Sequence, residues 1–452
     1  MGTEKALIAE TLASFSLDDY RPIHPRDLDL GKPLKPKAGN LVTAITGMRR
    51  AGKSYRLFQE MDALLQSGVS SEQILYFNFE DDRLAPVTPE VGDLVLESFF
   101  AIHPIALKKG AYFFFDELQE MENWGTWLRR VVDTNRATIY VTGSSSRMLS
   151  REISTEFRGR SISYEQAPYS FVEYAKVRSP RLDLSQQSLS RAARLATQDL
   201  LATYLDQGGF PAALELSNSQ RIHLLQSYVQ RVVARDVVER NNLSKPQVAT
   251  LFAQTCIGLN GRGLSLRKIA NDFKSRGLTT NRTSLSDMLG YFEDAFLVHT
   301  VKERSRALRE NDNTLPKVYV VDPGLFCANA PASVSDEGQR MEQVVYLELR
   351  RRENAGRRGS ISFLKTEEHG YEVDFAVGDA VYDDGLALYQ VAENLDSAEV
   401  RDRETRALWE AMRERGCQRS MLIVGDGVAE ALEQDGFRID VVPLWDWLKN
   451  NK

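Results

Sequence analysis

The chain has 452 residues, of which 42% are hydrophobic and 27% charged, a composition typical of soluble globular proteins and a length typical of about three domains. No apolar run reaches the roughly 18 residues that cross a bilayer, and the few, distant cysteines and histidines indicate neither a disulfide framework nor a zinc site. The net charge of −6 offers no general attraction for nucleic acid, so DNA binding requires local basic patches. We expect a cytoplasmic protein without a membrane segment.

The most informative stretch follows an N-terminal segment and linker, residues 1–37. A run of β-branched residues predicts a buried strand, and residues 47–54 then match the phosphate-loop pattern G-x-x-x-x-G-K-[ST]. Residues 55–66 have helical spacing. This order suits phosphate binding, because backbone N–H groups and the helix N-terminus then face the phosphates. The predicted nucleotide-binding residues are Gly47, Met48, Arg49, Arg50, Ala51, Gly52, Lys53, Ser54 and Tyr55.

The chemistry of ATP hydrolysis is predicted from two segments. We expect Lys53 to hold the β- and γ-phosphates of ATP and Ser54 to ligate Mg²⁺. The apolar strand at residues 111–115 ends in Asp116 and Glu117, the Walker B arrangement. Asp116 is expected to hold the water shell of Mg²⁺, and Glu117 to polarise the attacking water. A solvated acidic turn is the alternative interpretation of this pair.

Two further groups are candidates for roles near the γ-phosphate. The strand at residues 138–142 runs into Ser144 and Ser145, and either serine is expected to orient water there, because ligands lie at the carboxyl ends of parallel strands. Either serine also suits a helix N-cap. Arg158 and Arg160 lead the next strand and are candidates for reaching the γ-phosphate of a neighbouring subunit. Each is equally well interpreted as a solvated surface charge.

These motifs, in this order, resemble the AAA+-type ATPases of bacteria and archaea, and more narrowly the archaeal-ATPase-like group that ends in a restriction-endonuclease-like domain. The resemblance covers nearly the whole chain from about residue 38. It implies an ATPase core over residues 38–175 and a helical lid over residues 176–255. In that lid, Gly209-Phe210-Pro211 is similar to the element that packs against the nucleotide base, so Pro211 is a candidate contact. A plain Gly-Pro helix break is the alternative.

The next segment, residues 256–312, is predicted to contain a winged helix. Helical stretches at 264–273 and 280–293 precede a strand pair at 295–301 and 317–321, an order that resembles that fold. The local excess of basic residues favours contact with DNA phosphates, and contact with a protein is an equal alternative. The basic residues are Lys268, Lys274, Arg276, Arg282, Lys302, Arg304, Arg306 and Arg309.

Residues 313–452 alternate helices and strands in an order that resembles the PD-(D/E)xK nuclease core. In that family, an acid on the first helix, a strand aspartate and a (D/E/Q)-x-Lys pair bind Mg²⁺ and activate water. Glu342, Asp374 and Gln390 match, but the lysine position is Ala392. Since nothing obvious then stabilises the attacking hydroxide, we expect a degenerate nuclease fold used for binding or assembly. For Glu342 alone, a surface charge is the alternative.

The predicted fold class is an α/β multidomain protein with a P-loop AAA+ ATPase core, a helical lid with winged helix, and a C-terminal α/β nuclease-like domain. The predicted function is Mg²⁺-dependent ATP hydrolysis by a homo-oligomer, for instance a ring, that remodels or translocates DNA with little sequence preference. The alternative is a nucleotide-switched signalling or defence ATPase whose C-terminal domains bind protein partners.

Overall fold

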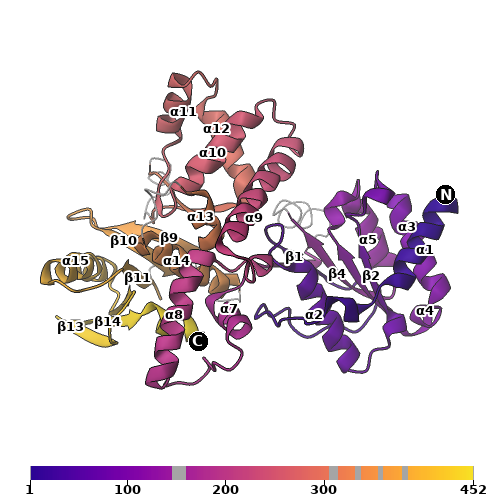
Figure 1. Ribbon diagram of the computed structural model, residues 1–452, viewed down its shortest axis with the longest axis horizontal. Helices are drawn as coiled ribbons and strands as arrows, with labels where there is room; N and C mark the ends of the chain where they lie inside the picture. Colours follow the sequence, from indigo (N-terminus) through magenta and orange to yellow (C-terminus); the bar gives the residue numbers. More distant parts are fainter. Residues whose placement is uncertain are drawn as a thin grey trace. The chain divides into compact units, whose positions relative to one another are not determined.

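The computed structural model describes residues 2–144, 159–304, 314–330, 337–354, 360–378 and 385–450 (Figure 1). The chain divides into two compact units. Unit 1 comprises Met1–Ala167 with Asp294–Phe296, and unit 2 comprises Pro168–Glu293 with Leu297–Lys452. Each unit has its own large sheet and its own hydrophobic cores.

Unit 1 is built on a five-stranded sheet in the order β2-β3-β4-β1-β5, in which every pairing is parallel. Parallel strands covered on both faces are expected to be apolar throughout, and every residue of β3 is buried. Because all five strands run the same way, their carboxyl ends lie along one edge of the sheet. The strands are β1 (Val42–Thr46), β2 (Ile74–Asn78), β3 (Ala111–Asp116), β4 (Ala137–Gly143) and β5 (Ser161–Glu165).

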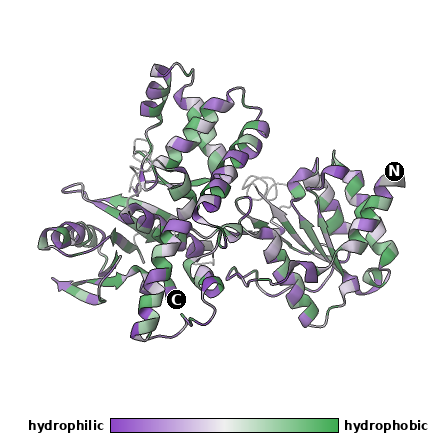
Figure 2. Cartoon of the chain, in the orientation of Figure 1, coloured by the Kyte–Doolittle hydropathy of each residue, from purple (hydrophilic) through white to green (hydrophobic). Residues whose placement is uncertain are grey.

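Helices cover both faces of this sheet. Successive side chains of a strand point to opposite faces, so Phe113 and Phe115 belong to one core while Tyr112 and Phe114 belong to the other. The first core is completed by α1 (Gly2–Ser14), α3 (Pro89–Ile102) and α5 (Trp124–Thr134), and the second by α2 (Lys53–Gln66). In Figure 2, the helices around this sheet carry both hydrophobic and hydrophilic residues.

The residues before β1 are packed parts of unit 1. Ile8 of α1 lies in the core with α3 and α5, whereas Leu17 and Leu30 lie in the core with α2. Arg26 is buried and donates to the carbonyl oxygen of Ala51 in the phosphate loop at 2.9 Å. The short elements of unit 1 are η1 (Leu17–Tyr20), η2 (Ser71–Gln73), η3 (Asp82–Leu84), α4 (Ile105–Lys109) and η4 (Leu118–Glu120).

Unit 2 contains a six-stranded mixed sheet in the order β13-β14-β12-β11-β10-β9. Its strands are β9 (Ser360–Lys365), β10 (Glu372–Gly378), β11 (Ala387–Ala392), β12 (Arg419–Val424), β13 (Glu430–Gln434) and β14 (Phe437–Pro443). One face packs against α7 (Phe171–Arg178), α8 (Arg191–Gln207), α14 (Glu337–Asn354) and α16 (Leu444–Lys449). The other face packs against α15 (Ala398–Arg415).

A smaller sheet in unit 2 has the order β6-β8-β7. Its strands are β6 (Arg262–Gly263), β7 (Val298–Val301) and β8 (Lys317–Val320). The helices and strand pair expected between residues 256 and 321 are present, and β8 pairs antiparallel with β7. The remaining elements are η6 (Pro211–Ala213), α9 (Asn218–Arg231), the π-helix η7 (Val232–Glu239), α10 (Pro246–Gly258), α11 (Leu266–Ser275), α12 (Arg282–Asp294) and α13 (Pro323–Asn329).

A buried aspartate fixes the turn between β8 and α13. Asp322 caps α13 by accepting from Leu325 N at 3.0 Å, and it also accepts from Gly209 N at 2.7 Å. The neighbouring glycines have no room for a side chain, since a Cβ on Gly209 would lie 2.2 Å from the Tyr169 carbonyl oxygen. Burial raises the pKa of Asp322 to about 6, although the backbone N–H groups that it accepts from lower it.

This raised pKa predicts a pH dependence of stability. The folded state holds the Asp322 proton more tightly than the unfolded chain, so the contribution of this group to stability falls as pH rises from about 4 to about 6. Asp322→Asn removes the titration. The free energy of unfolding of the variant minus that of the parent should therefore increase by up to about 3 kcal/mol as the pH rises from about 4 to about 7. Urea unfolding at both pH values measures this, with Asp287→Asn, at an exposed position of α12, as control. Parallel pH profiles for parent and Asp322→Asn would contradict the prediction.

Candidate functional site

The phosphate loop connects the carboxyl end of β1 to the start of α2, as the sequence predicts. Gly47 has φ +144°, and a Cβ there would lie 2.1 Å from the carbonyl oxygen of Gln166, so only glycine fits. Gly52 has φ +97° and directly precedes α2. Arg50 also has positive φ, and Met48 and Ala51 are buried. The loop backbone therefore surrounds the N-terminus of α2, where partial positive charge favours phosphate.

Lys53, the first residue of α2, is 3% exposed. Its Nζ donates to the carbonyl oxygens of Gly47 at 3.2 Å and Met48 at 3.4 Å, and lies 3.3 Å from Glu117 Oε1. The ammonium is thus held inside the loop, next to the carboxylate that follows β3. A bound phosphate would compete with Glu117 for this lysine.

Asp116 and Ser54 meet at the same edge of the sheet. Ser54 donates a hydrogen bond to Asp116, which is fully buried. Tyr76 donates its hydroxyl proton to Asp116 Oδ2 at 2.9 Å, and Thr142 bonds Oδ1. Burial raises the pKa of Asp116, and the neighbouring Glu117 adds to the rise. Since a hydroxyl and a carboxylate side by side are magnesium ligands in phosphate-loop enzymes, Ser54 and Asp116 fit the predicted Mg²⁺ site.

Glu117 is placed by hydrogen bonds that the sequence did not predict. Its φ of +49° departs from the strand, and its N–H donates to Thr142 Oγ1 at 2.9 Å. Gln119 donates to its carboxylate and lies 3.3 Å from Ser144 Oγ. Burial alone would raise the pKa of Glu117, but Lys53, Gln119 and Arg49 lower it below its ordinary value. Glu117 is therefore an ionised carboxylate suited to accept a hydrogen bond from water.

Two other predicted nucleotide contacts have different surroundings. Arg49 is largely buried and pairs with Glu80 at 2.9 Å and Glu120 at 3.2 Å, which ties the phosphate loop to the segments after β2 and β3. Tyr55 is 45% exposed beside the loop, and its ring packs edge-on against Phe58. An exposed aromatic ring at this position has a face available to a planar ligand.

The remaining candidates near the γ-phosphate are only partly described. Ser145 and Arg158 lie outside the described residues. Arg160 begins the approach to β5 and pairs with Asp133 at 2.7 Å, with 53% of its side chain exposed. Its carbonyl oxygen accepts from Val42 N, so it lies at the amino end of β1, opposite the edge that carries the phosphate loop. Pro211 belongs to unit 2, in the Gly208–Pro211 turn that packs on Tyr169 and Asp322.

The predicted nuclease-like residues converge in unit 2, and a lysine joins them. Lys317 Nζ lies 2.9 Å from Glu342 Oε1 and 3.3 Å from Asp374 Oδ1. It also lies 2.8 Å from Glu372 Oε1. Gln390 bonds the backbone N–H of Asp374 at 3.2 Å. The sequence has Ala392 at the position of the expected lysine, but in the structure the ammonium of Lys317, on β8, lies within the cluster. In the sequence, the only local feature that marks Lys317 is its charge, because it begins a strand that otherwise consists of Val and Tyr.

This cluster has perturbed protonation equilibria. Burial would lower the pKa of the Lys317 ammonium, but Asp374, Glu342 and Glu372 raise it above its ordinary value. Burial, with the nearby Glu342, raises the pKa of Asp374 to about 7, although Lys317 opposes the rise. The lysine is therefore charged throughout the physiological range.

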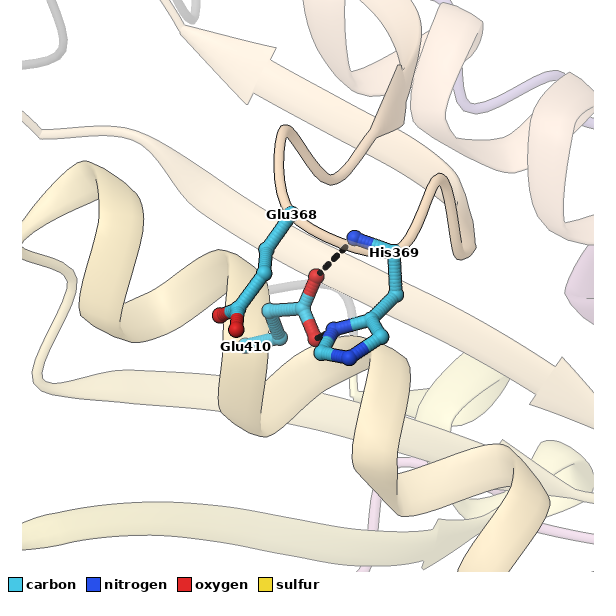
Figure 3. Close-up of side chains that lie close together, drawn as sticks. All are labelled: Glu368, His369 and Glu410. Carbon is cyan, nitrogen blue, oxygen red and sulfur yellow. Dashed lines mark hydrogen bonds and ion pairs between the residues drawn. The ribbon is translucent and has the colours of Figure 1, made fainter.

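A second polar cluster lies on the surface of the same domain. Glu368, His369 and Glu410 have ligand-type atoms within 4.8 Å of one another (Figure 3). Glu410 of α15 accepts from the backbone N–H of His369 at 3.1 Å and lies 2.8 Å from its Nδ1. These bonds hold the turn between β9 and β10 against α15, which explains the arrangement without a metal ion.

The basic residues of the small-sheet region are largely at the surface. Lys268, Lys274, Arg276 and Arg282 are exposed on α11, α12 and the turn between them. Arg276 pairs with Asp272 at 3.0 Å, but both side chains are about half exposed, so this pair contributes little. In the other predicted group, Arg304 is buried, and Arg306 and Arg309 lie outside the described residues.

Comparison with known proteins identifies the class of unit 1. Residues 39–175 match the family model AAA_14, described as an AAA domain. Together with the parallel sheet and the phosphate loop, this match means that the chain contains a P-loop ATPase domain of the AAA+ type. Residues 198–336 match a domain of unknown function, DUF8612.

Two relatives are similar to this protein across most of the chain. "Uncharacterized protein MJ1544" of Methanocaldococcus jannaschii is 29% identical, covering 90% of this chain and 88% of its own length. An "Uncharacterized protein" of Haemophilus influenzae is 27% identical, covering 91% and 95%. Among solved structures, the Walker-type ATPase PABY2304 of Pyrococcus abyssi is 16% identical, with a TM-score of 0.41, covering 64% of this chain and 90% of its own. Among the described helices, none has the length and apolar character needed to span a bilayer.

Proposed function

We propose that this protein is a Mg²⁺-dependent ATPase that works as a cytoplasmic homo-oligomer on DNA. The observation that supports hydrolysis best is the meeting of four groups: the Lys53 ammonium, the Ser54 hydroxyl and the Asp116 and Glu117 carboxylates. Lys53 binds the phosphates, Ser54 and Asp116 hold Mg²⁺, and Glu117 polarises the attacking water. Gln119 orients Glu117 and Ser144. When ATP binds, the γ-phosphate draws Lys53 away and leaves Glu117 free to accept from water.

The neighbouring candidates extend this site. Tyr55 is a further contact to the nucleotide, Pro211 is the candidate for a contact to its base, and Ser145 orients water near the γ-phosphate. Arg158 and Arg160 reach the γ-phosphate of the next subunit. The position of Arg160 at the far edge of its own sheet suits action in trans, because a five-residue strand separates it by about 16 Å from its own phosphate loop.

The DNA-binding part of the proposal rests on the helices α11 and α12. In the winged-helix arrangement, Lys268, Lys274, Arg276 and Arg282 contact backbone phosphates, which favours binding of duplex, forked or branched DNA with little sequence preference. The C-terminal nuclease-like domain contributes binding or assembly. Work on DNA, as remodelling or translocation, is then driven by ATP turnover in unit 1.

Charge reversal tests this part. Arg276→Glu with Arg282→Glu should weaken DNA binding and lower the slope of log affinity against log salt, by about 0.9 for each duplex phosphate contact that is lost. DNA-stimulated ATPase activity should fall in parallel, while activity without DNA stays unchanged. Fluorescence anisotropy over a salt series, together with phosphate release, measures both.

The matched control is Arg413→Glu with Arg419→Glu. These residues are also exposed in unit 2, and the net charge changes equally. If both double variants lose affinity alike, α11 and α12 are not the specific DNA-binding surface, and either general charge or the C-terminal domain is responsible. If the parent binds no duplex, single-stranded or branched DNA at low salt, the signalling alternative, with protein partners for the C-terminal domains, replaces the DNA proposal.

A further inference from the structure

The carboxylate cluster of unit 2 is arranged around a single point. Three oxygens, from Glu342 on α14 and from Glu372 and Asp374 on β10, lie within 3.3 Å of Lys317 Nζ. An ammonium has three N–H donors, and three acceptors at these distances use all of them. The lysine side chain is 7% exposed.

The carboxylate oxygens are also occupied by other donors of the protein. Glu342 Oε1 accepts from the Tyr319 hydroxyl at 2.6 Å, and Asp374 Oδ2 accepts from Val391 N at 2.9 Å. Gln390 extends the same network. Its side-chain oxygen accepts from the backbone N–H of Asp374, and its amide nitrogen donates to Glu404 on α15 at 3.0 Å. The cluster thus already forms a connected set of hydrogen bonds within the chain.

Three carboxylates around one point are the ligand set of a hard divalent cation such as Mg²⁺, Mn²⁺ or Ca²⁺. Here that point is filled by a nitrogen that carries a positive charge. A metal ion placed among the same oxygens would lie within about 3 Å of the ammonium, where repulsion in a buried site is strong. The residues present therefore do not fit a metal ion while Lys317 stays in place.

We propose that the ammonium of Lys317 replaces the divalent cation of a nuclease-type site, so that the cluster binds no metal, cleaves no DNA and instead fastens β8 to α14 and β10. A neighbouring contact has the same effect. Asn260 accepts from Val320 N at 2.9 Å and donates to Gln343 of α14 at 3.1 Å, which holds the other end of β8. The small sheet is thereby joined to the layer that covers the six-stranded sheet, independently of ATP.

The test compares Mn²⁺ binding by the nucleotide-free full chain and by Lys317→Ala, using the electron paramagnetic resonance signal of free Mn²⁺. The parent should bind no Mn²⁺ that depends on Glu342 or Asp374. Lys317→Ala removes the charge and leaves space among three carboxylates, so it should bind one Mn²⁺ per chain more than the parent does, with an affinity at least about tenfold above the weakest binding that the titration detects. Mn²⁺ should also raise its melting temperature. Adding Asp374→Asn should abolish both effects.

Lys365→Ala is the matched control. Its Nζ lies 5.9 Å from the same Phe363 ring as Lys317, but it is 47% exposed and its partner Glu303 is 3.9 Å away. This variant should behave as the parent does. Two results would overturn the proposal: Mn²⁺ binding or Mn²⁺-dependent DNA cleavage by the parent that is lost in Asp374→Asn, or a folded Lys317→Ala that binds no Mn²⁺. If Lys317→Ala does not fold, the parent titration decides by itself.

Discussion

Glu117→Gln is expected to keep ATP binding and to lose hydrolysis by about 10²–10⁴-fold, the usual contribution of a general base. Glutamine preserves the shape of the side chain and its contacts with Gln119, but its amide cannot accept a proton from the attacking water. Lys53→Ala should differ by losing nucleotide binding itself, because the loop then lacks the ammonium that faces the phosphates. Equilibrium binding of a fluorescent ATP analogue and steady-state phosphate release separate the two effects.

Glu122→Gln provides a matched control for this comparison. It makes the same chemical change on the same loop after β3, at an exposed side chain. Its turnover should equal that of the parent. Parental turnover by Glu117→Gln would mean that the assignment of the Walker B glutamate is wrong, even if Lys53→Ala behaves as expected.

Arg160→Ala is expected to lower turnover strongly without a matching loss of ATP affinity, and Arg158→Ala is expected to do the same. An arginine that acts in trans contributes about 10³–10⁵-fold in favourable cases. Arg160 pairs with Asp133 in its own chain, but both side chains are about half exposed, so the pair costs little to separate. Phosphate release at several protein concentrations, alongside ATP binding, measures the effect.

Mixing experiments distinguish an arginine in trans from a local defect. A mixture of Arg160→Ala with Lys53→Ala should recover part of the activity, because each chain supplies the group that the other lacks. Arg130→Ala is the control: its side chain is equally exposed, at 53%, and it pairs with Asp93 in the same way. A strictly monomeric enzyme with full activity would exclude action in trans.

The core of the nucleotide site was predictable from the sequence because its chemistry depends on consecutive residues. The phosphate loop and the start of α2 are one contiguous segment, and Asp116 and Glu117 end a single apolar strand. The parallel order of the strands then brings both segments to one edge of the sheet. The prediction of a P-loop α/β core is confirmed by the observed sheet and by the AAA domain match.

The supporting contacts of this site were not predictable in the same way. Thr142 on β4 and Tyr76 on β2 form hydrogen bonds with Asp116. Both are residue types that are common in strands, so nothing in the sequence distinguishes them. The segment before β1 has few apolar residues in regular order, yet Leu17 and Leu30 pack under α2. Such positions are fixed by which strands become neighbours, and local propensity contains no information about that choice.

Lys317 shows the difference most clearly. By itself, the sequence determined the phosphate-loop pattern, the acidic pair that ends β3, and three positions, Glu342, Asp374 and Gln390, that match a nuclease pattern with Ala392 in place of its lysine. Only the tertiary structure decided that an ammonium from β8, 25 residues before Glu342 and 57 before Asp374, fills the centre of that cluster. The physical reason is that buried carboxylates require a compensating positive charge, and any chain segment that folding brings near can supply it.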